Sequence, residues 1–135
     1  MHEAEPTVER EILALVNENW QFFASWDNGT ITTDRIDWLD HREWDDRVLV
    51  NDQIPGAIEP KAGISEGFVS MHGRFADDHV SPRIELLFLG VVAPNVYVVT
   101  YRQYYDFASG KITHRVITEV LVRKGDDLRV QYIHE

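Results

Sequence analysis

The sequence predicts an α+β domain in which helices cover one face of an antiparallel sheet. Two observations predict this class. Apolar residues recur with helical spacing in the first half of the chain, whereas the last third, residues 91–135, reads as long strands joined by short turns. We expect the order helix, helix, strand, helix and then four strands. These elements would form one domain over residues 7–135, after a flexible tail at residues 1–6.

The first helix is predicted to begin at Thr7, which can cap it, and to end at Asp27-Asn28-Gly29. Glycine readily adopts the left-handed conformation in which many helices terminate. One face of the segment carries apolar residues at i, i+3 and i+4 spacing, which is typical of an amphipathic helix: Ile12, Leu15, Val16, Trp20, Phe23 and Trp26.

The next segment is predicted to hold two further helices around one strand. Residues 34–43 form a shorter helix with an acidic outer face, Arg47–Val50 a strand, and residues 51–63 a loop rich in proline and glycine. A third helix, over about residues 61–76, would place Phe68, Met71 and His72 on one face. Asp37 and His41 lie one helical turn apart, but one such pair is short of the three or four ligands of a zinc site. We therefore expect a solvated helix face there and no metal.

The sheet is predicted from four segments rich in β-branched and aromatic residues. Turns containing proline, asparagine, aspartate or glycine separate them. The segments are Arg83–Val92, Asn95–Tyr105, Ile112–Arg123 and Leu128–His134.

Composition excludes several function classes. The net charge of −10 argues against a broad basic face for nucleic acid. No apolar run is long enough to span a membrane, and the N-terminus lacks the basic start and apolar core of a signal peptide. The absence of cysteine excludes disulfide and thiolate chemistry and fits a cytoplasmic protein. No glycine-rich nucleotide loop occurs, and we expect no cofactor.

Four short motifs carry a resemblance to a known family. They are Gln103-Tyr104-Tyr105-Asp106 before a glycine-containing turn, Thr118 and Val120 before Arg123-Lys124-Gly125-Asp126, the terminal Tyr132-Ile133-His134, and Glu66-Gly67 followed by His72. Together with the element order they resemble the nuclear transport factor 2-like (SnoaL-like) superfamily. Within it, the resemblance is closest to the association domain of calcium/calmodulin-dependent protein kinase II and its stand-alone bacterial relatives. Two of that family's arginines fall on Thr100 and Glu119 here.

The resemblance implies a cone-shaped fold whose concave face carries the functional side chains. On strands of this chain those would be Arg102, Tyr104, Glu119, Tyr132 and His134. His72 and Trp20 would reach the same cavity from helices, and Asp46 would lie at its mouth. Two outcomes stay open for the charged pair on the strands: Arg102 and Glu119 neutralise each other, or they face a ligand.

Two functions follow from the resemblance. The first is a stand-alone association-domain-like protein that forms a homodimer or higher homo-oligomer and binds a small organic molecule, anionic ones included, in the cone. Its dimer contact would be an outer sheet face of Tyr97, Val99, Tyr101 and Tyr105. The alternative is a cofactor-free isomerase, dehydratase or cyclase. Glu119, His72 or Asp46 would then act as the base that takes up the substrate proton. Tyr104, Tyr132 or Arg102 would donate hydrogen bonds to the enolate-like oxyanion. A third hypothesis is a structural hub whose cone is filled by side chains.

Overall fold

The computed structural model describes residues 2–37, 44–51, 59–60 and 68–134, with the backbone alone for residues 36–37, 44–51 and 59–60. Within these residues the labelled elements are one long helix, one 3-10 helix and six strands. They are α1 (Pro6–Asn28), η1 (Thr33–Asp37), β1 (Trp44–Asn51), β2 (Glu59–Pro60), β3 (Val80–Ala93), β4 (Val96–Phe107), β5 (Ile112–Lys124) and β6 (Asp127–His134).

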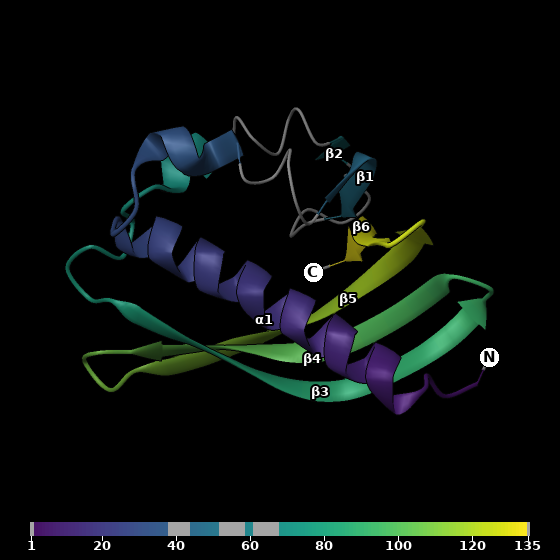
Figure 1. Ribbon diagram of the computed structural model, residues 1–135. Coiled ribbons are helices and arrows are strands. Elements are labelled where there is room, and N and C mark those ends of the chain that lie inside the picture. Colours follow the sequence, from purple (N-terminus) through teal and green to yellow (C-terminus); the bar gives the residue numbers. More distant parts are fainter. Residues whose placement is uncertain (1, 38–43, 52–58, 61–67, 135) are drawn as a thin grey trace.

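The strands form a single curved sheet in the order β2-β1-β6-β5-β4-β3, and α1 lies across its concave face (Figure 1). Neighbouring strands are antiparallel except for β1 and β6, which are parallel. The predicted α+β class, with helical structure on one side of a largely antiparallel sheet, is therefore confirmed. Among the residues described, no helix is both long and apolar enough to cross a membrane.

Helix α1 begins one residue earlier than expected. Pro6 occupies the first turn, where its missing N–H costs no hydrogen bond, and Glu5 is the capping residue without a side-chain cap bond. The predicted capping role of Thr7 is therefore wrong, because Thr7 already lies within the helix. The C-terminus agrees with the prediction: Gly29 has a φ of 72° and donates its N–H to Trp26.

The end of α1 is fastened to a segment far away in the sequence. The N–H groups of Gly73 and Phe75 donate to the carbonyl oxygens of Trp26 and Asp27 at 3.0 and 2.8 Å. Asn28 adds a pair of 2.8 Å hydrogen bonds between its side-chain amide and the backbone of Val80. The last carbonyls of a helix have no partner within it, so these contacts satisfy groups that would otherwise need water.

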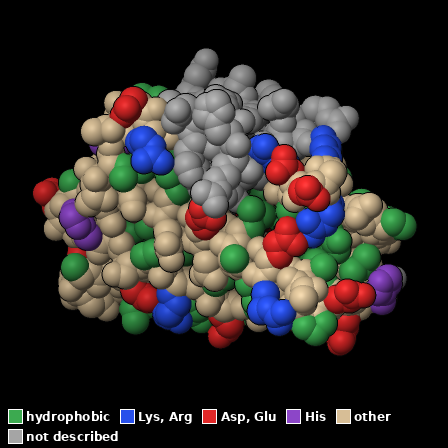
Figure 2. Space-filling view, viewed as in Figure 1, with side chains coloured by type: hydrophobic (Ala, Val, Ile, Leu, Met, Phe, Trp, Pro, Cys, Tyr) green, Lys and Arg blue, Asp and Glu red, His purple; other side chains and the backbone are tan. Residues whose placement is uncertain are grey.

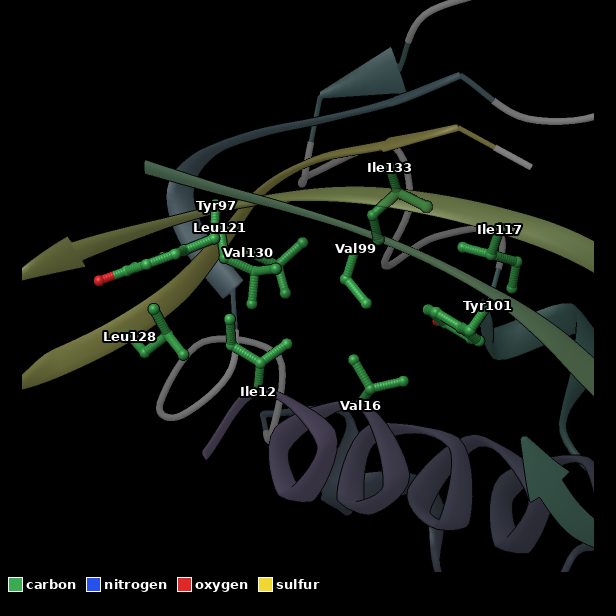
Figure 3. Close-up of a cluster of buried hydrophobic side chains, with 10 residues drawn as sticks. All are labelled: Ile12, Val16, Tyr97, Val99, Tyr101, Ile117, Leu121, Leu128, Val130 and Ile133. Atoms are coloured by element: carbon green, nitrogen blue, oxygen red, sulfur yellow. The ribbon is translucent and has the colours of Figure 1, made fainter. Parts of the chain in front are cut away.

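The hydrophobic core lies between α1 and the sheet. In Figure 3, Ile12 and Val16 point from the helix toward Val99, Ile117 and other strand side chains. A second cluster near the helix C-terminus joins Trp20, Ala24, Val80 and Tyr105. Between them these clusters contain the predicted apolar stripe of α1 except Trp26, which is 1% exposed and belongs to neither cluster.

The two faces of β4 are the reverse of what the resemblance implied. Tyr97, Val99, Tyr101 and Tyr105 are all less than 9% exposed, so the predicted aromatic dimer surface is wrong: these side chains form the core under α1. The physical reason is that four large side chains bury more apolar area than the opposite face of the strand would, and alternation then turns Arg102 and Tyr104 outward.

Other elements differ in extent. The predicted helix over 34–43 begins as the short 3-10 helix η1, and residues 38–43 lie outside the described residues. Of the predicted helix over 61–76, residues 68–71 are helical and 72–77 form turns, while 61–67 lie outside the described part. Strand β3 starts at Val80 and pairs with β4 up to Phe107, because the backbone stays extended at both ends of that hairpin.

Several surface charges form ion pairs. The Arg83 guanidinium donates two hydrogen bonds to the Asp106 carboxylate, with N···O distances of 2.8 and 3.0 Å. The Arg123 guanidinium donates two to the Glu11 carboxylate, at 2.6 and 3.0 Å. On the face drawn in Figure 2, acidic and basic side chains lie next to each other over the lower half of the molecule. The net charge of −10 is therefore not gathered into one uniform acidic face there.

Candidate functional site

Glu119 is the most unusual side chain of the described core. Strand β5 holds it between Val99 of β4 and Ile133 of β6, and it is 1% exposed. The Tyr101 hydroxyl donates to its Oε1 at 2.8 Å. Among the described residues, its Oε2 is buried with no hydrogen-bond partner. An unpaired buried carboxylate oxygen is costly, so this atom marks a place where a partner is missing.

Burial raises the pKa of Glu119 from 4.5 to about 7, although the hydrogen bond from Tyr101 acts in the opposite direction. The cause is loss of hydration: the charged form is destabilised among apolar side chains such as Leu121 and Ile117. A carboxyl group with a pKa near neutrality can both accept and release a proton at neutral pH.

A second polar group lies further along the same face, toward the β4–β5 turn. Tyr105 donates its hydroxyl to Gln103 at 2.9 Å, and Arg115 donates Nε to the same oxygen at 3.1 Å. Trp20 packs on Tyr105 with ring centroids 4.8 Å apart and donates Nε1 to the Tyr104 carbonyl at 3.3 Å. The predicted ligand contact Trp20 is thus 2% exposed and held by structural bonds.

His72 has structural partners on both sides. Its Nε2 lies 2.7 Å from the Ile31 carbonyl, and its ring meets the Trp26 indole edge-on at 4.8 Å. Trp26 is anchored in turn by donating Nε1 to Phe68 at 2.6 Å. These contacts account for a histidine at this position without a ligand.

Of the two outcomes left open for Arg102 and Glu119, mutual neutralisation is excluded. Arg102 binds Glu85 of β3 at 2.5 Å on the outer face, whereas Glu119 faces the core. The register explains this: Arg102 lies opposite Val116, and Glu119 lies opposite Val99. Residues directly opposite each other share a face, so these two charges must lie on different faces.

The remaining predicted strand residues also lie away from Glu119. Tyr104 has the Arg83 guanidinium 3.7 Å above its ring on the outer face. A β-bulge near Leu121 shifts the register of β6, so that His134 lies opposite Thr118 and Tyr132 lies opposite Val120. Thr118 and Val120 point outward, and His134 and Tyr132 therefore point outward as well. The side chain of Asp46 lies outside the described residues.

Tyr101, the donor to Glu119, was not predicted as a site residue. The register of the β4–β5 hairpin could have identified Tyr101. When Asp106 pairs with Ile112, Tyr101 lies diagonally opposite Glu119 on the same face of the sheet. The ion pair between the buried Asp27 and the exposed Arg74, at 2.9 Å, was also missed because its partners are far apart in sequence. Among the residues described, no group of three or more His, Asp or Glu side chains is placed to hold a metal ion.

Comparison with solved structures decides the fold. An NTF-2-like protein of unknown function from Pseudomonas aeruginosa superposes with a TM-score of 0.66 at 22% identity, covering 94% of both chains. The chain has the nuclear transport factor 2-like fold. ActVI-ORFA from Streptomyces coelicolor gives 0.65 at 14% identity over 95% of both chains. A putative calcium/calmodulin-dependent protein kinase type II association domain from Thiobacillus denitrificans gives 0.58 at 18% identity, covering 87% of this chain and 89% of that one.

The sequence similarity of this chain to known proteins is low. No protein-family model matches it, and no curated protein matches it. The fold of the predicted resemblance is confirmed, including similarity to an association domain. Because the fold hosts different activities, function has to be argued from this chain's own residues.

Proposed function

We propose that this protein is a homodimer that binds a small organic molecule at Glu119, on the face of the sheet covered by α1. The observation that carries the proposal is the buried, unpartnered Oε2 of Glu119 among the described residues. A ligand that supplied a hydrogen bond to this oxygen would remove a desolvation penalty of roughly 1–3 kcal/mol.

The surroundings favour a neutral, largely apolar ligand. The cluster around Glu119 is formed by aliphatic and aromatic side chains, and the expected inward cation, Arg102, lies on the other face. An anion would have to approach a carboxyl group without that cation. A molecule with an apolar body and one hydroxyl or N–H donor matches the site better, because it can bury area and satisfy Oε2 together.

The test uses 2-naphthol, which has a hydroxyl donor, and 2-methoxynaphthalene, which lacks it. We expect 2-naphthol to raise the melting temperature of the wild type more than the ether does, since a ligand that binds only the folded state stabilises it. Glu119→Leu should abolish this difference by removing the acceptor. Tyr101→Phe should preserve it, because both carboxyl oxygens remain. Equal effects of the two compounds on the wild type, or an undiminished difference in Glu119→Leu, would overturn the proposal.

A second function, cofactor-free isomerisation of a carbonyl compound, is favoured by the pKa of Glu119, raised to about 7. Glu119 would take a proton from carbon next to the carbonyl and return it at another position. The donors first expected for the oxyanion, Arg102, Tyr104 and Tyr132, lie on the opposite face, and Tyr101 donates to Glu119 itself. Exchange of α-protons of 2-tetralone with D2O, followed by NMR, tests this function. Rates unchanged in Glu119→Gln would refute it.

The dimer is proposed to form through the outer face of β3, β4 and β5. This surface consists of outward side chains around a hydrogen bond between the Thr100 and Thr118 hydroxyls at 2.9 Å. Phe88 is 43% and Val116 46% exposed on it. Arg102 adds a second argument, because its buried Nε has no partner among the described residues and a second copy could supply an acceptor. A two-fold axis would place the same patch on both subunits.

Sedimentation or light scattering tests the dimer with a matched pair of variants. Val116→Asp places a charge in the proposed interface and should yield monomers at micromolar concentration. Val69→Asp makes the same change at a valine that is 56% exposed in the short helical segment after residue 67, and it should leave the assembly intact. A monomeric wild type, or equal behaviour of the two variants, would rule out this interface.

A further inference from the structure

Asn19 is a second buried polar side chain whose hydrogen bonding is incomplete. It lies in the middle of α1 and is 5% exposed. Within the described part of the chain, its Oδ1 is buried and has no hydrogen-bond partner. The side-chain amides of Asn28 and Gln103, by contrast, are both engaged in hydrogen bonds. Asn19 is therefore an exception that needs a physical explanation.

The position of Asn19 on α1 directs its side chain toward the sheet. Asn19 follows Val16 by three residues and precedes Phe23 by four, and this spacing places all three on one face of the helix. Val16 belongs to the core cluster between α1 and the sheet, and Phe23 packs against that cluster. In Figure 3, Val16 points from α1 toward the strands. Asn19 lies almost one turn further, about 4.5 Å along the helix axis.

Glu119 borders the same layer from the opposite side. It lies directly opposite Val99 in the β4–β5 register, so both side chains share the face of the sheet that α1 covers. Val99 belongs to the same cluster as Val16. Among the described residues, the layer between helix and sheet is thus bordered by two unpartnered acceptor atoms, Asn19 Oδ1 on α1 and Glu119 Oε2 on β5.

These two acceptors weaken the free protein. A buried oxygen without a donor destabilises the folded state, whereas an apolar side chain at the same position does not. Natural proteins depart from this rule mainly at functional sites, where binding requires a polar group inside an apolar layer. A ligand with two donors would satisfy both oxygens at once.

We propose that Asn19 is the second polar contact of the ligand held at Glu119, and that this ligand carries two donor groups on an apolar ring body. This assignment rests on the proposed function and narrows its ligand class from compounds with one donor to compounds with two. One hydroxyl donates to Glu119 Oε2 and the other to Asn19 Oδ1, while the ring packs among the apolar side chains of the cluster. A ligand with a single hydroxyl is held at Glu119, because an ionised carboxylate is a stronger acceptor than an amide.

Asn19 then determines specificity. A site whose polar groups are arranged for a ligand hydroxyl discriminates against the analogue that lacks it, since the protein group stays buried and unpaired. Blocking one hydroxyl of a diol with a methyl group should therefore weaken binding, roughly tenfold for one hydrogen bond.

Isothermal titration calorimetry of 2,6- and 2,7-dihydroxynaphthalene and of their monomethyl ethers tests the second contact. The two isomers present the second hydroxyl in different directions, and each ether keeps one hydroxyl for Glu119. In the wild type we expect at least one diol to bind roughly tenfold more tightly than its ether. In Asn19→Leu this ratio should fall to about twofold, which is the statistical advantage of two equivalent hydroxyls.

A matched variant, a smaller substitution and a simpler ligand serve as controls. Asn17→Leu makes the same change at an exposed position of α1, where the amide donates to the Leu13 carbonyl at 3.0 Å, and it should keep the wild-type ratio. Asn19→Ala removes the acceptor with a smaller side chain, should leucine not be accommodated. 2-Naphthol should keep its advantage over 2-methoxynaphthalene in Asn19→Leu, because its hydroxyl contacts Glu119.

Either of two results would overturn the role of Asn19: diols that bind no more tightly than their ethers in the wild type, or a diol preference that persists in both Asn19 variants. In both cases a preserved advantage of 2-naphthol over its ether leaves the proposal at Glu119 standing. Absence of that advantage in the wild type would instead refute the Glu119 site and the Asn19 contact together.

Discussion

Replacing Glu119 by glutamine should make the protein less sensitive to alkaline pH. In the folded protein the pKa of Glu119 is raised from 4.5 to about 7, so the native state holds this proton more tightly than the unfolded chain does. Its contribution to stability is fully present below the unfolded pKa and is lost as the pH rises through about 7. Since a tenfold change in proton affinity corresponds to about 1.4 kcal/mol, the loss between acid and alkaline pH is about 3 kcal/mol. Glutamine is isosteric and does not titrate, so Glu119→Gln should lack this loss.

Urea denaturation at about pH 5 and about pH 8.5 measures the effect, since the free energy of unfolding follows from the midpoint and slope. The wild-type free energy of unfolding should fall relative to that of Glu119→Gln by about 2.5 kcal/mol over this interval, because part of the loss already lies below pH 5. Glu11→Gln is the control. The hydrogen bond from Arg123 lowers the pKa of Glu11, so its contribution is present above the unfolded pKa and is lost as the pH falls. Identical pH dependence in the wild type and Glu119→Gln would refute the reasoning.

Two further predictions follow from single contacts. Tyr101→Phe removes the hydrogen bond that lowers the pKa of Glu119, so the carboxyl carbon should titrate above about 7 in a 13C NMR experiment; an unchanged or lower pKa would contradict the assigned contact. Gly29→Ala should cost about 1–2 kcal/mol in urea denaturation, because φ is +72° and the new Cβ would lie 3.2 Å from the Gly73 Cα. Gly110→Ala is its control: it also has a positive φ, but no atom lies within 4 Å of the added Cβ, so an equal or larger loss there would exclude the close approach as a cause.

The sequence was sufficient to predict the main architecture. Helical and alternating periodicities located α1 and the strands β3 to β6 within a few residues, because each element buries one face against the other layer. The resemblance also placed Glu119 on the inner face of its strand, and the buried neighbours at alternate positions, Ile117 and Leu121, agree with that placement.

The sequence pattern could not predict which residues contact Glu119. Alternation separates two faces of a strand but does not say which one is buried, and a change of one residue in register moves every side chain to the other face. Assigning Arg102 to the interior by resemblance therefore misplaced it together with Tyr104. The Asn28–Val80 contact was unpredictable for another reason, because it joins positions 52 residues apart that periodicity cannot relate.

The parallel pairing of β1 with β6 constrains the order in which the strands of the sheet can pair during folding. Leu49 finds its partner Tyr132 only after roughly 80 further residues have been made, and closing so long a loop carries an entropic cost. On the ribosome, β1 must wait while the β3–β4 and β4–β5 hairpins, which need only local turns, can already pair. We expect the β1 edge that receives β6 to stay open until then, so that it is the edge at which another chain could pair during synthesis, and we expect docking of β6 to be a late step of folding.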